Sequence, residues 1–351
     1  MSFRYLGSKL RLLESLKGHI GNYNGQGQFV DAFCGTGSVA KLASDLGWPV
    51  KINDQLESGA VMAASQLISR KNVAFESLGG YEKTIDLLNS LAPVDGFFWR
   101  EYSPASSSFI DIERKYFTEC NAKKIDAISQ KLSAWQNQNL LSDAELILLK
   151  SDLIRAVNKI ANIAGTYGCF LSKWTKQSQA DLTLTTQSLR SDETSFKCST
   201  KNVFDLQVDS NDLVYLDPPY TKRQYASYYH ILETLVHFDE PNVEGVSGLR
   251  PWKDKSSEFC YKKKALGALT RLIKQLDSKK ILLSYSSEGH VEINELIQNL
   301  IDVGTVEVFP LQKIGRYRPN KKASDNNNIV DEFLIVIEKM ETKGSLGSCK
   351  N

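Results

Sequence analysis

Apolar runs and helical patterns alternate along the first 70 residues of the chain. Residues 28–35 form a short apolar run that ends in glycine, which is typical of a buried strand. Residues 38–47 then place four apolar side chains on one helical face and stop at a glycine. A second strand is predicted over 50–54 and a second helix over 57–70. Strand, helix, strand and helix in this order predict right-handed βαβ units and a mostly parallel sheet.

The pattern becomes mostly helical over residues 78–164, and no parallel-strand signal interrupts this block. Its last helical segment begins with Ser142 three residues before Glu145, which is the spacing of a capping box. We therefore interpret residues 78–164 as a helical insertion. It separates two parts of one α/β domain, residues 1–77 and residues 165–340.

Strand patterns resume over residues 211–220, 279–286, 305–313 and 330–339. A polar segment rich in turn-forming residues separates the last two, so we expect them to pair as an antiparallel hairpin at a sheet edge. Residues 341–351 are expected to form a flexible tail.

Length and composition agree with this interpretation. A chain of 351 residues has room for two structural units, or for one large α/β domain with an insertion. Hydrophobic residues make up 42% and charged residues 24%, which excludes disorder of the whole chain. The net charge is only +2, so any nucleic-acid-binding surface has to be a local basic patch.

Cysteine and histidine spacings do not suggest a metal site. The six cysteines contain no C-x-x-C pair, and the four histidines lack the spacing of zinc ligands. Neither zinc nor a disulfide framework is therefore expected. No run of 18 apolar residues occurs and the first residues lack a signal-peptide pattern, so we expect a soluble, intracellular protein that does not enter a membrane.

The sequence DAFCGTGSVA (31–40) lies where a predicted strand meets a predicted helix. Gly35 and Gly37 allow a tight turn and a close approach of a ligand to the backbone, and Gly35-x-Gly37-x-x-Ala40 fits the dinucleotide fingerprint. Asp54 follows Gly37 by 17 positions, near the distance expected for an acid that binds ribose. A purely structural turn is the alternative. The functional interpretation predicts a ligand with a nucleoside, its ribose hydroxyls on Asp54.

A second motif, DPPY, follows the strand pattern that ends at Leu216. Ligands bind at this carboxyl edge in open α/β sheets. Pro218 and Pro219 fix the backbone and remove two donors, which leaves the carbonyl oxygens of Asp217 and Pro218 free to accept. Together with the ring of Tyr220, these acceptors suit an amino group on a flat ring. The alternative is an ordinary turn after a strand.

Four blocks in this order resemble the Dam-like (D12 class) N6-adenine DNA methyltransferases of type II restriction-modification systems. They are RYLGSK (4–9), DAFCGTG (31–37), Asp54 and DPPY (217–220). GTYGCFLSKW and RQYASYYHILETL are also similar to segments of such enzymes. The resemblance implies a Rossmann-like fold that binds S-adenosylmethionine and an adenine flipped out of the duplex. It also makes the helical insertion a candidate target-recognition region.

The resemblance implies roles for individual residues. In the catalytic loop, Asp217 and Pro218 would accept from the target amine and Tyr220 would stack on the base; with Pro219 they form the catalytic set. Lys9 would contact the carboxylate of the cofactor, Asp54 its ribose, and Asp205 would lie near its adenine. The full cofactor-binding set comprises Tyr5, Lys9, Phe33, Gly35, Gly37, Asp54, Asp205 and Asp217.

Local basic groups offer surfaces for DNA despite the low net charge. Lys222 and Arg223 directly follow DPPY and are the strongest candidates, because they adjoin the catalytic loop. The other candidates are Lys173 and Lys176 near GTYG, and Arg316 and Arg318 in the late hairpin. A solvated charged surface is the alternative for each group.

The leading hypothesis is a site-specific adenine-N6 methyltransferase that acts on double-stranded DNA, and no metal is expected. We expect a monomer in the cytoplasm of a bacterium or in a phage-infected cell, associated with the nucleoid, with a cognate restriction endonuclease as a functional partner. The alternatives are an RNA adenine methyltransferase and a DNA-binding module with a vestigial cofactor pocket. A nicotinamide-dependent oxidoreductase would also use the glycine turn, but DPPY has no purpose in that chemistry.

Overall fold

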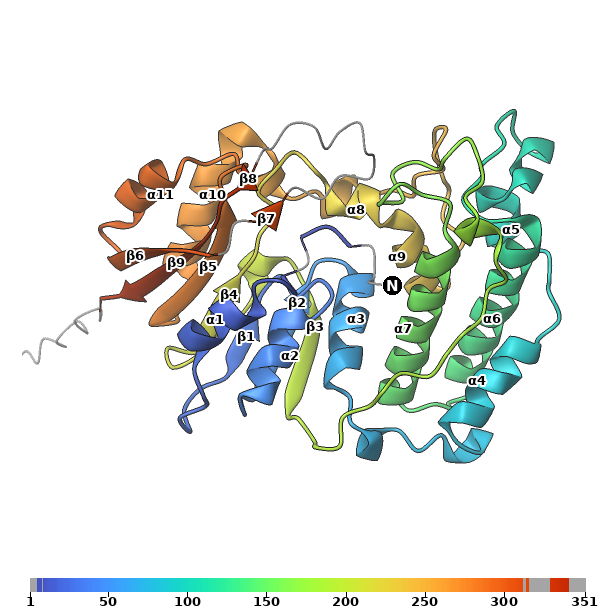
Figure 1. The fold of residues 1–351 in the computed structure, drawn as a ribbon, viewed down its shortest axis with the longest axis horizontal. Coiled ribbons are helices and arrows are strands. Elements are labelled where there is room, and N and C mark those ends of the chain that lie inside the picture. Colours follow the sequence, from blue (N-terminus) through green and yellow to red (C-terminus); the bar gives the residue numbers. More distant parts are fainter. Residues whose placement is uncertain (1–4, 8, 312–313, 316–328, 341–351) are drawn as a thin grey trace, which may run out of the picture.

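The computed structural model describes residues 5–7, 9–311, 314–315 and 329–340, which form an α/β fold built on a seven-stranded sheet (Figure 1). The strands pair in the order β3 (Phe196–Thr200), β2 (Val50–Asp54), β1 (Phe29–Asp31), β4 (Leu213–Leu216), β5 (Lys280–Ser286), β9 (Glu332–Lys339) and β6 (Gly304–Pro310). The first five strands are parallel, and β9 is antiparallel to both β5 and β6. A short pair, β7 (Ile314–Gly315) and β8 (Ile329–Val330), lies outside this sheet.

This topology confirms the predicted fold class, including the antiparallel pairing of the last two predicted strands at a sheet edge. β1 pairs with β2 on one side and with β4 on the other, so the strand order reverses between β1 and β4. Ligands of open α/β sheets bind at the carboxyl ends of strands at such a switch point.

Within the seven-stranded sheet, β3 is the strand that the sequence-based prediction lacks. It lies at the sheet edge, and its side chains are exposed or only partly buried. An edge strand without a buried face has no apolar run, and therefore gave no signal.

Helices cover both faces of the sheet. On one face α1 (Leu13–Ile20), α2 (Ser38–Asp45) and α3 (Glu57–Leu67) pack against side chains such as Tyr215. On the other face α10 (Lys262–Gln275) and α11 (Ile293–Leu300) pack against side chains such as Val214. Neighbouring residues of a strand point to opposite faces, and β4 therefore contributes to both cores.

The helix predicted over 57–70 is shorter than expected. It ends at Leu67, and Ile68 is extended. Ser69 and Asn72 then form a capping box that begins a separate short 3-10 turn. This local competition from side-chain hydrogen bonds explains the error.

The predicted helical block contains α4 (Tyr81–Ser90), α5 (Phe97–Tyr102), α6 (Glu119–Asn137) and α7 (Asp143–Ile160). The capping box at the start of α7 is confirmed, because Ser142 Oγ accepts from the Glu145 amide and the Glu145 carboxylate accepts from the Ser142 amide. α7 packs against α3 and α9 (His230–His237), as Figure 1 shows. The helical block and the helices beside the sheet therefore share one apolar core.

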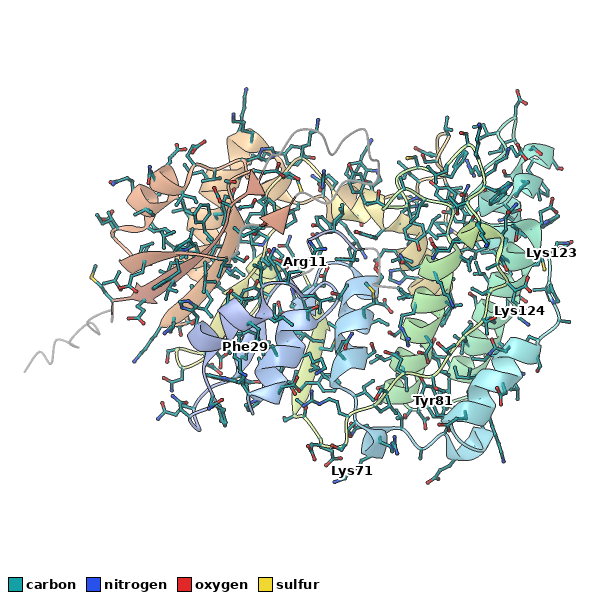
Figure 2. The ribbon with its side chains drawn as sticks, viewed as in Figure 1. Arg11, Phe29, Lys71, Tyr81, Lys123 and Lys124 are labelled. Carbon is teal, nitrogen blue, oxygen red and sulfur yellow. The ribbon has the colours of Figure 1, made fainter. Side chains whose placement is uncertain are left out.

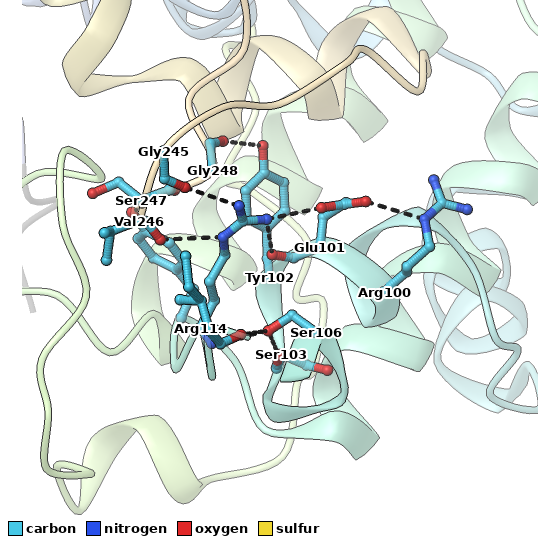
Figure 3. Close-up of polar contacts among 12 residues, drawn as sticks. Arg100, Glu101, Tyr102, Ser103, Ser106, Arg114, Gly245, Val246, Ser247 and Gly248 are labelled. Carbon is cyan, nitrogen blue, oxygen red and sulfur yellow. Dashed lines mark hydrogen bonds and ion pairs between the residues drawn. The ribbon is translucent and has the colours of Figure 1, made fainter. Parts of the chain in front are cut away.

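Buried polar groups attach a long loop to this helical block (Figure 3). The Arg114 guanidinium, 3% exposed, donates to the carbonyl oxygens of Gly245 and Val246 and to Glu101. The Tyr102 hydroxyl donates to the Gly248 carbonyl oxygen. The loop after α9 is thus held by side chains far from it in sequence.

Side chains fill the space between the sheet and the helices (Figure 2). Phe29 lies within the sheet core, whereas Lys71 and Lys123 lie at the outer edges. No helix in the part of the chain that the structure describes has the length and apolar character needed to cross a membrane.

Candidate active site

A cavity opens at the carboxyl ends of β1 and β4, at the switch point of the sheet. The N-terminal segment, the turn after β1, the end of β2, the loop after β4 and the segments 201–204 and 255–259 line it. Its lining includes nine residues of the predicted catalytic and cofactor-binding sets: Tyr5, Lys9, Phe33, Gly35, Asp54, Asp217, Pro218, Pro219 and Tyr220.

The turn between β1 and α2 needs glycine at two positions. Gly35 has φ +49° and lines the cavity, whereas Gly37 has φ +80° and packs against α3. A Cβ atom on Gly37 would lie 2.5 Å from the Cα atom of Ala63. Gly37 therefore allows close packing of the turn on α3, while Gly35 forms part of the cavity wall.

Asp54, at the end of β2, fixes the shape of this turn. Its two carboxylate oxygens accept hydrogen bonds of 2.9 Å from the backbone amides of Gly35 and Leu56. Burial raises the pKa of Asp54 to about 6, although these hydrogen bonds act in the opposite direction. Each carboxylate oxygen can accept a further hydrogen bond, so Asp54 retains the capacity to bind hydroxyl groups of a ligand.

Asp31 is a cavity residue that the sequence-based assignment missed. It is 1% exposed, and its Oδ1 atom has no hydrogen-bond partner among the described residues. Burial raises the pKa of Asp31 to about 8, and the nearby carboxylates of Asp217 and Asp54 add to this shift. A carboxyl group with a vacant acceptor suits a cationic ligand group. In the sequence, Asp31 is the acidic first residue of DAFCGTG, the motif that also contains Phe33, Gly35 and Gly37.

The loop after β4 brings Asp217 against Lys9 of the N-terminal segment. Lys9 Nζ lies 2.9 Å from Asp217 Oδ1, 4.0 Å from Glu332 Oε2 and 5.5 Å from the centre of the Tyr220 ring. Burial raises the pKa of Asp217, and the Lys9 ammonium opposes this shift. Burial alone would lower the pKa of Lys9, but Asp217, Tyr215 and Glu332 together raise it. Lys9 is thus a cation paired with Asp217, and its contact with a cofactor carboxylate stays a prediction.

Two tyrosines from the segment RQYASYYHILETL hold the N-terminal block over the cavity. The rings of Tyr5 and Tyr229 stack with their centres 4.4 Å apart, and the Leu6 amide donates to the Tyr229 hydroxyl at 2.8 Å. The hydroxyl of Tyr225, in α8 (Tyr225–Tyr228), donates to the Leu6 carbonyl oxygen at 3.4 Å. The segment RQYASYYHILETL therefore positions the N-terminal block, a role that its sequence similarity alone did not indicate.

Aromatic side chains form another part of the cavity wall. The rings of Phe204 and Phe259 stack with centres 5.9 Å apart, and Phe33 meets Phe259 edge to face. Asp205 follows Phe204 but is exposed and is not a lining residue. Its predicted place near the adenine of a cofactor is not supported by a cavity contact and stays a prediction.

The predicted basic residues lie at the surface where they are described. Lys222 and Arg223 are exposed and lie between the lining residues Tyr220 and Gln224. Lys173 and Lys176 are also exposed. Arg316 and Arg318, and the predicted tail 341–351, lie outside the described residues.

Lys255 is a cationic lining residue that the sequence-based assignment missed. It forms a 3.0 Å ion pair with Glu233 of α9. A single lysine in a polar loop gave no signal, because its neighbours in the cavity come from distant segments.

Comparisons with known proteins show which family the chain is similar to. The family model for D12 class N6 adenine-specific DNA methyltransferases matches residues 5–299. The chain is 32% identical to modification methylase StsI of Streptococcus sanguinis and 32% identical to type II methyltransferase M.FokI of Planomicrobium okeanokoites, each match covering 96% of this chain and 52% of the relative. It is 28% identical to type II methyltransferase M.NlaIII of Neisseria lactamica, over 95% of this chain and 99% of the relative. The chain thus spans about half the length of the first two relatives.

Proposed function

The chain belongs to the D12 class of N6 adenine-specific DNA methyltransferases, and from this premise we propose that it methylates the N6 amino group of adenine in double-stranded DNA with S-adenosylmethionine as methyl donor. One observation carries the proposal for this site: the glycine turn after β1 and the DPPY loop after β4 line the same cavity. A nucleoside-containing donor on the first can therefore reach an amino group held by the second.

The residues present fit S-adenosylmethionine. Asp31 has a vacant buried acceptor for an ammonium group, Asp54 has acceptor capacity for ribose hydroxyls, and the rings of Phe33 and Phe204 offer apolar surface to a purine. When bound, S-adenosylmethionine supplies a methyl group on a sulfonium sulfur that keeps the bonding electron pair when the methyl group leaves. Tyr5 covers this part of the cavity, stacked on Tyr229.

The DPPY loop would orient the target amine. The exocyclic nitrogen of adenine is a weak nucleophile because its lone pair is delocalised into the ring. Hydrogen bonds from its two N–H groups to the Asp217 carboxylate and the Pro218 carbonyl oxygen favour a pyramidal nitrogen with an exposed lone pair. The nitrogen then gives up one proton, for which the Asp217 carboxylate is the acceptor within reach. Tyr220 supplies the ring against which the base stacks outside the duplex.

In this proposal, residues around the cavity bind the DNA. Lys222 and Arg223 are exposed next to the DPPY loop and would bind phosphates, as would Lys173 and Lys176. Residues 78–164 would contribute to target recognition, because α7 packs on α3 and α9 beside the cavity. The names of type II relatives support a cognate restriction endonuclease as a functional partner.

The test is methyl transfer from labelled S-adenosylmethionine to duplex DNA and, separately, to RNA, followed by digestion and identification of the methylated nucleoside. We expect label on N6-methyladenine from duplex DNA. Asp217→Ala should abolish transfer and still bind the cofactor, while the exposed Asp302→Ala should transfer at the wild-type rate. Label only on RNA or on cytosine, or wild-type turnover by Asp217→Ala, would contradict the proposal.

A further inference from the structure

We propose that Glu332 is a positioning residue for the methylation reaction, because it accepts the Lys9 ammonium while Asp217 binds the target amine. The proposal rests on the function proposed above for Asp217. It concerns a residue of β9 that lies far in sequence from both partners.

The geometry places one cation between two carboxylates. Lys9 Nζ lies 2.9 Å from Asp217 Oδ1 and 4.0 Å from Glu332 Oε2. Lys9 is 6% exposed and Glu332 is 8% exposed, so water contributes little to the solvation of these charges. A displacement of about 1 Å by the ammonium would convert the long contact into a hydrogen-bonded ion pair.

Glu332 has the acceptor that such a displacement needs. Its Oε2 atom has no hydrogen-bond partner among the described residues, and its Oε1 atom lies 3.5 Å from the Tyr220 hydroxyl. The backbone of Glu332 is fixed, because it pairs with Ser286 of β5 and its carbonyl oxygen accepts from the Leu311 amide at 2.8 Å. The carboxylate is therefore held beside both Lys9 and the ring proposed to stack on the base.

The Glu332 carboxylate is needed when the target amine binds to Asp217. In the structure Lys9 holds Oδ1 of Asp217 and so competes for the carboxylate that the amine has to reach. A buried ammonium that loses its ion-pair partner is strongly destabilised. Without a second carboxylate nearby, Lys9 would therefore stay on Asp217. Glu332 removes this obstacle, since Lys9 keeps an ion-pair partner when it yields Asp217 to the amine.

The charge of Glu332 also affects the ionisation of Asp217. Burial raises the pKa of Glu332, the Lys9 ammonium opposes this shift, and repulsion from the Asp217 carboxylate adds to it. Activity requires ionised Asp217, so the rate of transfer rises with pH as this carboxyl group ionises. Without the Glu332 charge, Lys9 has Asp217 as its remaining carboxylate partner of this pair, and we expect the pKa of Asp217 to fall. The acid limb, which is the part of the pH profile where the rate rises with pH, then moves to lower pH. The other titratable groups around Asp217 are Lys9, Asp31, Tyr215, Tyr220 and Tyr225.

The experiment measures the single-turnover rate of methyl transfer as a function of pH for wild type, Glu332→Gln and Glu332→Asp. A matched control is Glu338→Gln, which removes an exposed glutamate of the same strand that pairs with Lys280. We expect Glu332→Gln to lower the plateau rate by roughly 10- to 100-fold, as for loss of a charged hydrogen bond, and to move the acid limb to lower pH. Glu332→Asp keeps the charge and should keep the wild-type limb. The KM for S-adenosylmethionine should change less than about twofold, since Glu332 does not line the cavity.

A merely structural role would lower the rate without moving the limb. A wild-type plateau rate for Glu332→Gln, an unmoved limb, or a limb shifted equally in Glu332→Asp would each overturn the proposal. Asp217→Ala in the same assay distinguishes an error in the role of Glu332 from an error in the proposed function of the site. If that variant is inactive while Glu332→Gln is normal, only the role of Glu332 is wrong; if Asp217→Ala is active, the proposed function of the site is wrong.

Discussion

Replacement of Arg114 by methionine should destabilise the fold, because this buried guanidinium joins the loop after α9 to the helical block (Figure 3). It donates hydrogen bonds of 2.8–3.1 Å to the Glu101 carboxylate and to the carbonyl oxygens of Glu101, Gly245 and Val246. Methionine fills a similar volume but donates nothing. The substitution would therefore leave three carbonyl oxygens and one carboxylate without this partner.

The magnitude follows from these contacts. Loss of one partner of a buried ion pair costs about 3–5 kcal/mol, and each buried carbonyl oxygen left without a donor adds to this. The carboxylate side chain of Glu101 is 20% exposed and still pairs with Arg100, and the loop can relax towards water. Both effects favour the lower end of the range. We expect a loss of about 3 kcal/mol in the free energy of unfolding.

Urea denaturation of Arg114→Met and wild type measures this difference, and Arg100→Met is the matched control. Arg100 pairs with Glu101 and Glu240, but its side chain is 39% exposed. Its loss should cost less than about 1 kcal/mol, as for other surface ion pairs. Equal stability of the two variants, or a loss below about 1 kcal/mol for Arg114→Met, would refute the assigned anchoring role.

Two further predictions concern the glycine turn and a histidine. Gly37→Ala should lower the melting temperature and weaken cofactor binding. Gly37 has a left-handed φ, and the added Cβ atom would overlap Ala63. A wild-type melting curve would contradict this prediction. Ion pairs with two glutamates raise the pKa of His237 from 6.5 to about 9. Its stabilising contribution is thus complete below about pH 6.5 and is lost as pH rises through about 9. The stability difference between wild type and His237→Gln should therefore shrink over that range; a constant difference would contradict the linkage.

The parts of the fold that could be predicted are those with a local cause. Buried strands such as β1 and β4 lie in largely apolar runs, and the two residues of the α7 capping box lie within four consecutive positions. The edge strand β3 has neither signal, and the helix α3 ends early because Ser69 offers the backbone a competing turn. Local patterns therefore located the core of the sheet better than its margin.

The cavity was predictable only as a set of motifs. The sequence indicated that the glycine turn and the DPPY loop follow strands, and the parallel order then required them to share one edge. It could not indicate that Lys9 pairs with Asp217, or that Tyr229 holds the N-terminal block, since these contacts join segments about 200 residues apart and depend on side-chain direction. The same limit applies to the Arg114 anchor.

Glu332 is an intermediate case, because the topology contains the information that places it. The five parallel strands end at the edge of the sheet where the cavity opens, so a strand that runs antiparallel to them begins at that edge. Glu332 is the first residue of β9, and it pairs with Ser286, the last residue of β5. An acidic residue at the start of an antiparallel strand thus reaches the same edge as the acidic residue that follows a parallel one. The observed pairing of β9 with β5, which the predicted hairpin did not specify, is therefore what brings Glu332 to the edge that carries Asp217. The positive charge of Lys9 between them allows two carboxylates to share that edge.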